Sequence, residues 1–344
     1  MADSRVNSGT AVSANSQSRG LLDLMILHIP GLKTVDRNVL CNKFKNENDL
    51  VHSKNDIEAI LGHPLPRKSW SMDKVRKQAE KDQKAAELRG IKTVSLAEEK
   101  YPPLLREIYD PPHLLFYLGI LPNPEKCLAA IVGTRKPSSA AAAMAYNLGR
   151  DLGKAGIPVV SGLALGIDAF AHRGNLDAGA SAVAVLGSGL DQIYPASNRG
   201  LARQILEKGG ALFSEYAPGT GPMKWHFPAR NRIISALSRG TIIVEAPEKS
   251  GALITASFVL EQDRDLWVSS VGVQSSQGKG SAKLAADGAK VINSARDILI
   301  EWGLEKHSTE GTELESQQSP DDLGTGAVLA SSLAKSLNID LRGN

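Results

Sequence analysis

The stretch CLAAIVGTRKPSSAAAAMA, residues 127–145, decides the fold of this 344-residue chain. A mostly apolar run leads into the turn Gly133-Thr134-Arg135, and an alanine-rich segment that Ser138 can cap follows. A short apolar run predicts a buried strand, and a serine at the start of a helical pattern predicts a helix N-terminus. The stretch therefore predicts a strand–loop–helix unit of an α/β fold.

The same alternation of short apolar runs and longer helical patterns continues to about residue 306. We expect strands at 127–133, 157–161, 181–187, 210–214, 240–246, 265–270 and 289–292. Strands that alternate with helices indicate a parallel sheet covered on both faces. We therefore predict that residues 127–306 form an extended Rossmann-like domain with a parallel sheet.

The residues before this sheet have a different pattern. From Leu21 onward, apolar residues recur at helical spacing, which predicts a small helical domain over residues 19–97. The motifs Tyr101-Pro102-Pro103 and Asp110-Pro111-Pro112 then indicate an extended connector over residues 98–126.

Residues 67–92 carry nine Lys/Arg against four Asp/Glu and predict one long charged helix. Its apolar positions, expected to face inward, are Val75, Ala79, Ala86 and Leu88. A solvated surface helix is the usual role of such a pattern, and a contact with DNA is the less favoured alternative.

Both ends of the chain lack an apolar rhythm. Residues 1–18 are rich in Ser, Asn and Ala, so we expect a disordered leader. Residues 307–344 are rich in Ser, Glu and Gly, so we expect a mostly disordered tail with a short helix over 327–338.

Composition limits the functions open to the chain. The net charge of +3 is only mildly basic, so any nucleic-acid site must be a local patch. The two cysteines, Cys41 and Cys127, match neither a disulfide framework nor a zinc motif. No apolar run reaches membrane-spanning length and no signal sequence is evident, so we expect a cytoplasmic protein without a membrane partner.

Small residues follow nearly every predicted strand. They lie in the loops 133–138, 161–168, 187–195 and 245–255. In α/β sheets, ligands bind beyond the carboxyl ends of the strands, where the amides at helix N-termini attract anions. These loops therefore predict one groove lined for phosphate.

The segment from His226 to Ile234 adds side chains suited to nucleic acid. Arginines such as Arg230 and Arg232 hold phosphates by paired hydrogen bonds, and the ring of Phe227 offers a stacking face. Together with Lys224, this segment predicts one wall of the groove.

The chain carries no Walker loop, no dinucleotide fingerprint after the first strand, no nucleophile elbow and no zincin motif. We therefore predict no catalytic residue, no cofactor and no metal ligand. Asp168 and His172 form an i, i+4 acid–histidine pair, interpreted as a helix cap with a supporting imidazole rather than a metal or acid–base site. Glu245 is interpreted as a carboxylate that holds Arg230 or Arg232, with a general-base role as the alternative.

The order and spacing of these loops resemble the DNA-processing protein A family (DprA, also called Smf). The similar motifs begin with Ile131-Val132-Gly133-x-Arg135-x-x-Ser138 and Ser161-Gly162-x-Ala164-x-Gly166-Ile167-Asp168. They continue with Val185-Leu186-Gly187-x-Gly189-Leu190-Asp191, Phe227-Pro228-x-Arg230-Asn231-Arg232 and Ser250-Gly251-x-Leu253-x-Thr255.

The resemblance implies a sterile-alpha-motif-like helical domain before the extended Rossmann domain. It also implies a homodimer that binds single-stranded DNA and loads the RecA recombinase onto incoming strands in natural transformation. The DNA-binding residues implied on this chain are Gly133, Arg135, Ser138, Ser161, Gly162, Gly166, Lys224, Phe227, Arg230, Asn231, Arg232, Ser250, Gly251 and Thr255.

This chain departs from the family pattern in three places. Ser139-Ala140 replaces an aromatic–glycine pair, and Val271-Gly272 replaces a Pro-Gly pair after the sixth strand. The tail after Lys306 is too short and too polar for the winged helix that many members carry.

Two other functions stay open on the sequence. One is a Rossmann-type nucleotide phosphoribohydrolase, although its Pro-Gly-Gly-x-Gly-Thr loop is replaced here by the residues from Ser250 to Thr255. The other is an interaction scaffold whose Rossmann pocket has lost its ligand.

Overall fold

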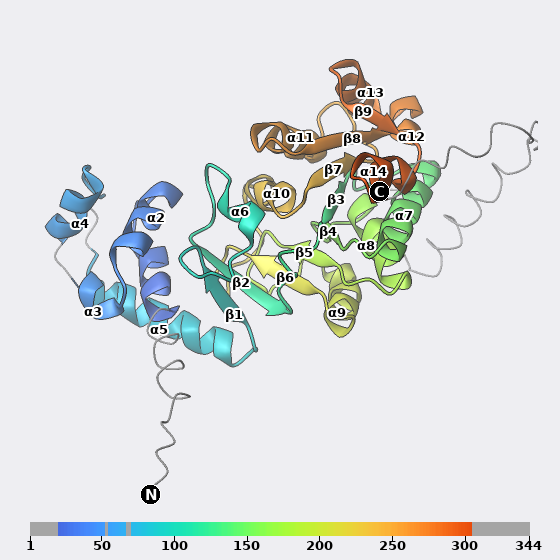
Figure 1. The fold of residues 1–344 in the computed structure, drawn as a ribbon. Coiled ribbons are helices and arrows are strands. Elements are labelled where there is room, and N and C mark those ends of the chain that lie inside the picture. Colours follow the sequence, from blue (N-terminus) through green and yellow to red (C-terminus); the bar gives the residue numbers. More distant parts are fainter. Residues whose placement is uncertain (1–19, 52–53, 67–69, 305–344) are drawn as a thin grey trace, which may run out of the picture.

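The computed structural model describes residues 20–51, 54–66 and 70–304 (Figure 1). The expected disordered leader, the expected tail and its short helix lie outside the described residues. No described helix has both the length and the apolar character needed to cross a membrane.

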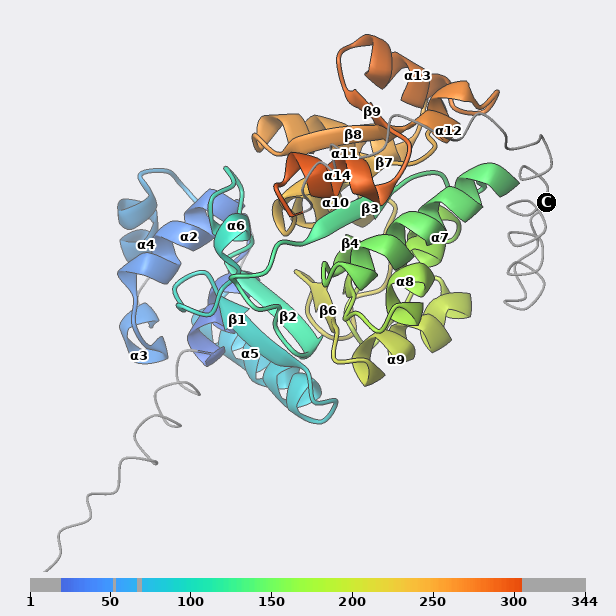
Figure 2. The ribbon, with the colours of Figure 1, turned by 45° about the vertical axis from the view of Figure 1, so that its right-hand side comes forward.

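One nine-stranded sheet, in the order β1-β2-β6-β5-β4-β3-β7-β8-β9, forms the centre of the molecule (Figure 2). Its strands are β1 (Lys92–Ser95), β2 (Leu114–Gly119), β3 (Ala129–Val132), β4 (Val159–Ser161), β5 (Val183–Val185), β6 (Ala211–Ser214), β7 (Gly240–Ile243), β8 (Asp265–Ser269) and β9 (Lys290–Ile292). The last seven strands in this order, from β6 through β5, β4, β3, β7 and β8 to β9, each pair in parallel with their neighbours.

All seven predicted strands are present, and the parallel Rossmann-like sheet is confirmed. Strands β3, β4, β5 and β7 consist almost entirely of small or β-branched apolar residues, and every residue in them is buried. Strands buried on both faces need such continuous apolar runs.

Strands β1 and β2 correct the expected boundary between the helical domain and the connector. Strand β2 lies inside the expected connector and pairs antiparallel with β6, and β1 pairs antiparallel with β2. The connector also contains helix α6 (Pro103–Arg106). The buried run Leu114–Tyr117 explains the difference, because it gains ladder hydrogen bonds and core contacts together. We therefore propose that the sheet domain starts at β1.

Helices cover both faces of the parallel strands. Helices α7 (Ser139–Lys154) and α8 (Ile167–Asp177) lie on one face, and α10 (His226–Ala236) and α11 (Gly251–Glu261) lie on the other (Figure 2). The remaining helices of this part are the 3₁₀ helix Ala196–Asn198, α9 (Arg199–Glu207), α12 (Ser270–Gln274), α13 (Lys279–Ala286) and α14 (Ala295–Glu301).

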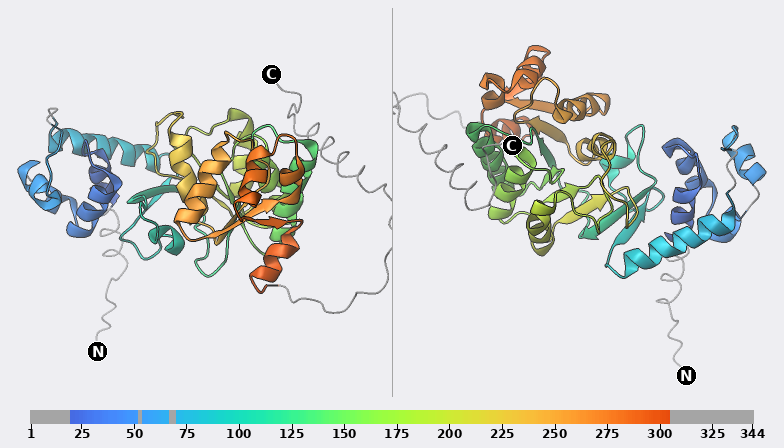
Figure 3. Two further views of the ribbon diagram at one scale, coloured as in Figure 1. Left: turned by 90° about the horizontal axis from the view of Figure 1, so that it is seen from above. Right: turned by 180° about the vertical axis from the view of Figure 1, so that it is seen from behind.

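A helical part precedes the sheet and lies at its β1 end (Figure 3). It contains helical residues 20–28, α2 (Thr34–Lys43), α3 (Glu47–Leu50), α4 (Lys54–Leu61) and α5 (Met72–Glu87). The imidazole Nε2 of His113 lies 3.1 Å from the carbonyl oxygen of Asp23, which joins this part to the start of β2.

Helix α5 is the predicted charged helix, and Val75, Ala79 and Ala86 face inward as expected. The prediction for Leu88 is wrong, because this residue is the C-cap, where the helix ends, and is 76% exposed. Asp82 is also buried in this helix and accepts a 2.7 Å hydrogen bond from His28.

Helices α7 and α8 approach each other through glycines, and this contact yields a prediction. A Cβ atom built at Gly174 would lie 2.0 Å from the carbonyl oxygen of Tyr146, so even alanine forces the helices apart. We expect Gly174→Ala to lower the free energy of unfolding by about 1–3 kcal/mol, as overpacking does. Urea unfolding measures the change.

Gly200→Ala is the matched control, because Gly200 lies in helix α9 and a Cβ atom added there would meet nothing within 4 Å. Removing this helical glycine is expected to leave stability unchanged or raise it by up to about 1 kcal/mol. Equal effects of the two substitutions would contradict the close packing of α7 on α8.

Candidate nucleic-acid interface

A cleft of about 630 Å³ opens at the carboxyl ends of β3 and β7. These strands are neighbours, but the chain leaves β3 toward α7 on one face and leaves β7 toward α11 on the other. Such a divergence is the point of an open α/β sheet where ligands bind. The loops after β3 and β7 and the first turns of α10 and α11 line the cleft.

The cleft brings together nine of the fourteen predicted site residues: Gly133, Arg135, Lys224, Phe227, Arg230, Asn231, Ser250, Gly251 and Thr255. Gly162 lines a smaller hollow of about 40 Å³ beside it, which shares Arg135, Phe227 and Arg230 with the cleft. Ser138, Ser161, Gly166 and Arg232 line neither space.

Arg230 lies at the floor of the cleft and is 4% exposed. Its Nη1 atom donates hydrogen bonds to the carbonyl oxygens of Gly162 and Val185. Burial lowers the pKa of Arg230 to about 10, against the opposing effect of the nearby Asp168 carboxylate, so the side chain stays cationic at neutral pH. Its Nε atom is buried and has no hydrogen-bond partner among the described residues.

The exposed cations of the cleft stand around this floor. Arg135, Lys224 and Lys249 come from three different loops, and all three are exposed. Sequence reasoning missed Lys249, although it directly precedes the predicted pair Ser250-Gly251 at the start of α11. Cations from separate loops around a buried arginine favour an extended polyanion over a single small anion.

Phe227 supplies the aromatic face. The guanidinium carbon of Arg135 lies 5.5 Å from the centre of its ring, and the ring of Tyr194 lies 5.5 Å away at a 46° tilt. Tyr194, which also lines the cleft, was another residue that sequence reasoning left out of the site, although its Tyr-Pro motif lies in one of the strand-exit loops. Aromatic and guanidinium planes in contact form a surface on which a base can stack.

Arg232 does not face the cleft. Its guanidinium donates to both carboxylate oxygens of Glu215, at 2.9 and 2.8 Å, and lies 3.3 Å from the Asp110 carboxylate. Its side chain is only 9% exposed. The expectation that Arg232 contacts DNA is therefore not supported by its placement: it ties α10 to the loop before β2.

The prediction that Glu245 holds Arg230 or Arg232 is wrong. The carboxylate of Glu245 is fully buried and accepts hydrogen bonds from the Ser138 amide at 2.8 Å, the Ser138 hydroxyl at 2.9 Å and the Ser275 hydroxyl. It holds neither Arg230 nor Arg232. A carboxylate of the protein thus lies at the N-cap of α7 and engages both the amide and the hydroxyl of Ser138. The bond from Ser275 also ties the end of α12 to Glu245.

The prediction that Asp168 caps a helix is wrong, because Gly166 is the N-cap of α8 and no side chain caps this helix. The Asp168 carboxylate accepts hydrogen bonds from the amides of Gly162 and Ala164, at 3.0 and 3.3 Å. His172 does not support it, because both ring nitrogens of His172 are buried without a partner among the described residues. No group of three acidic, histidine or cysteine side chains that could hold a metal ion occurs within the described ranges.

Ser161 and Gly166 do not line the cleft but support the loops that do. The Ser161 hydroxyl donates to the carbonyl oxygen of Ile131 on the neighbouring strand, at 2.6 Å. Gly166 has φ of +76°, and a Cβ there would lie 2.5 Å from the carbonyl oxygen of Thr134. Only glycine allows the loop after β4 to approach the Arg135 loop this closely.

These features define a Rossmann-like protein with a cationic, aromatic cleft at the switch point of its sheet. The sequence model of the family described as "DNA recombination-mediator protein A" matches residues 92–303. The chain belongs to this family.

Three similar proteins support the assignment. DNA processing protein DprA of Bacillus subtilis is 41% identical over 215 residues, which are 62% of this chain and 71% of that protein. The X-ray structure of DprA from Streptococcus pneumoniae matches 86% of this chain and 99% of its own, with 33% identity and a TM-score of 0.65. A structure of DprA from Helicobacter pylori, described for its single-stranded DNA binding mode, matches 62% of this chain and 96% of its own, with 29% identity and a TM-score of 0.54.

The buried charge pair of Arg232 yields a stability prediction. Glu215→Gln leaves the Arg232 guanidinium with only the partly exposed Asp110 carboxylate. We expect a loss of about 3 kcal/mol in the free energy of unfolding, because a buried charge without its partner is strongly destabilising. Glu207→Gln is the control, since Glu207 pairs with Arg203 at the surface, and it should change stability little. Similar losses in both variants would contradict the tie.

His172 yields a pH prediction. Burial lowers its pKa to about 3, so below pH 6.5 the unfolded chain binds a proton that the folded chain does not. Stability therefore falls as pH falls, by up to about 1.4 kcal/mol per pH unit for this group. We expect His172→Leu to flatten the decline between pH 6.5 and 5, measured by urea unfolding at several pH values. His113, whose pKa burial also lowers to about 3, keeps its own contribution in the variant. If the free energy of unfolding changes with pH as steeply in the variant as in the unmodified chain, this assignment of His172 is wrong.

Proposed function

We propose that this chain binds single-stranded DNA in the cleft and acts in the cytoplasm as a non-enzymatic recombination mediator. In this proposal it works as a homodimer and loads the RecA recombinase onto incoming strands during natural transformation. Support comes from membership of the recombination-mediator family and from the DNA-binding relative of known structure.

The observation that carries the proposal is the arrangement of cations at the switch point. Arg135, Lys224 and Lys249 line the same cleft as the buried Arg230, and the ring of Phe227 contacts both Arg135 and Tyr194. Cations along a groove neutralise successive phosphates and release counterions, while an aromatic ring accepts any base by stacking.

Selection for a single strand follows from the position of the deepest cation. A phosphate that reaches Arg230 must enter between the loops after β3, β6 and β7. A flexible single strand bends its backbone into such a cleft, whereas the stiff duplex presents its phosphates on a convex surface.

The phosphoribohydrolase alternative depended on Glu245 as a general base. Glu245 is not among the residues that line the cleft, and its carboxylate is engaged by Ser138 and Ser275. The observation that suggested catalysis therefore has a structural explanation.

Charge reversal at the cleft tests the proposal. We expect Arg135→Glu and Lys224→Glu each to weaken binding of a labelled single-stranded oligonucleotide. Each substitution should also lower the slope of log affinity against log salt by about 0.7, the value for one lost phosphate contact on a single strand. Fluorescence anisotropy at several salt concentrations measures both quantities.

Lys208→Glu is the matched control, because Lys208 is exposed at the far end of helix α9 and makes the same change in net charge. An equal effect of all three reversals would point to general electrostatics and remove the cleft from the proposal. Loss of DNA binding without loss of RecA loading, measured as filament growth on coated single strands, would separate the two parts of the proposed function.

A further inference from the structure

Trp225 is an exposed aromatic side chain beside the cleft. It lies between Lys224 and Phe227 in the sequence, and both of these residues line the cleft. Trp225 itself does not line the cleft and is 66% exposed. Its indole therefore lies at the rim. Proteins bury most of the surface of their tryptophans, so an indole left in water at the rim of a binding site is available to a ligand.

The neighbours of Trp225 hold its ring in place. The indole meets the ring of His226 edge-on, with 5.9 Å between the ring centres. His226 stacks on Tyr216 at 3.9 Å, and its Nδ1 atom lies 3.2 Å from the carbonyl oxygen of Gly187. The same glycine lies behind Phe227, because a Cβ atom built there would be 3.1 Å from the phenylalanine ring. A ring that is held before binding loses little conformational entropy when a ligand stacks on it.

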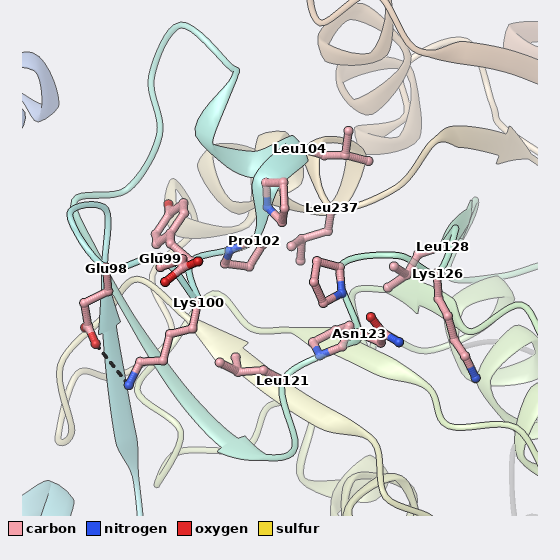
Figure 4. A pocket seen from close by; sticks show the side chains of 14 residues that line it. Glu98, Glu99, Lys100, Pro102, Leu104, Leu121, Asn123, Lys126, Leu128 and Leu237 are labelled. Atoms are coloured by element: carbon pink, nitrogen blue, oxygen red, sulfur yellow. Dashed lines mark ion pairs between the residues drawn. The ribbon is translucent and has the colours of Figure 1, made fainter.

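A second hollow, of about 810 Å³, does not continue the cleft. It lies at the opposite edge of the sheet, where Leu128 and Leu237 come just before the amino ends of β3 and β7 (Figure 4). Its inside is apolar, and its border carries two lysines and two glutamates, Lys100, Lys126, Glu98 and Glu99. Balanced charges around an apolar space do not attract a polyanion. The surface that continues the cleft is therefore its own rim, which includes Trp225.

We propose that Trp225 stacks on an unpaired base of the strand whose phosphates lie in the cleft. This inference rests on the proposed DNA-binding function. Lys224, directly before Trp225, lines the cleft and joins the indole to the cations there. Lysine is depleted in the cores of protein–protein interfaces, whereas sites for single-stranded DNA combine cations with rings on which bases stack. The neighbourhood of Trp225 therefore favours a base over a protein partner.

This contact distinguishes a single strand from a duplex. A ring stacks on the face of a base, and in a duplex both faces are covered by the neighbouring base pairs, so a base must first be taken out of the stack at a cost. Phosphates, in contrast, are exposed in both forms. Trp225 is therefore expected to add affinity for single strands and none for duplexes.

Tryptophan fluorescence tests the contact directly. Among the other tryptophans, Trp267 and Trp302 are 1% and 6% exposed, and Trp70 is half-buried. We expect a single-stranded thymidine oligonucleotide to quench the emission of the unmodified chain, because a stacked base quenches an indole. In Trp225→Phe the quenching should be lost, while the anisotropy of a labelled oligonucleotide still reports binding. Quenching of equal size in this variant would overturn the proposal.

Affinities separate stacking from a general effect on the fold. We expect Trp225→Ala to bind the thymidine oligonucleotide about 5- to 150-fold more weakly, the range for one lost stacked base. The slope of log affinity against log salt should stay the same, because no phosphate contact is lost. Affinity for a strand of abasic sites and for a duplex should also be unchanged.

Tyr109→Ala is the matched control, because Tyr109 is 93% exposed and lines neither the cleft nor the smaller hollow beside it. It should leave all these affinities unchanged. Equal weakening of Trp225→Ala on the abasic strand would overturn the proposal, and so would a changed oligomeric state in sedimentation, which would assign the indole to a contact between two chains. If the unmodified chain does not bind the oligonucleotide at all, the proposed DNA-binding function is wrong, and this inference with it.

Discussion

The parallel pairing of β3 with β7 is the constraint on which the rest of the structure depends. Four residue pairs, from Ala129–Gly240 to Val132–Ile243, hold the two strands in register. Because α7 and α11 follow them on opposite faces, the loops after these strands separate and leave a cleft. Most residues that line the cleft come from the segments after these two strands or from helix α10. The ladder therefore positions the site as much as it stabilises the sheet.

Side chains, rather than free backbone amides, supply the positive charge of the cleft. Glu245 accepts from the amide of Ser138, the N-cap of α7, and Asp168 accepts from the amides that precede α8. These two buried carboxylates satisfy backbone donors that a phosphate would otherwise use. Arg135, Lys224, Lys249 and Arg230 then supply the positive charge. A site built on long side chains adapts to a flexible backbone better than a rigid amide nest does.

Much of this architecture could be predicted from sequence, because continuous apolar runs and glycine loops report directly on buried parallel strands. Strand β2 was missed because the prolines before Leu114 suggested a connector, and β1 was missed because residues 92–95 were assigned to the helical domain. The pairing of β1 with β2 and of β2 with β6 joins segments that are distant in the sequence. The roles of Arg230 and Arg232 could not be separated from sequence. Residues two positions apart on a helix point in directions that differ by about 200°, and the sequence does not say which side of the helix faces the cleft. Glu245 was assigned to the wrong partner for a similar reason: its neighbours, Ser138 and Ser275, come from distant loops.

Helix α10 has a consequence beyond the cleft. Arg230 reaches the cleft floor, while Arg232, two residues later, is fastened to Asp110, and the next residue, Pro111, accepts a hydrogen bond from Asn38 of the helical part. One helix thus carries both contacts, that of Arg230 and that of Arg232, on opposite sides. A displacement of α10 that moved Arg230 would therefore also strain the bonds of Arg232 to Glu215 and Asp110, next to the point where Asn38 of the helical part is attached.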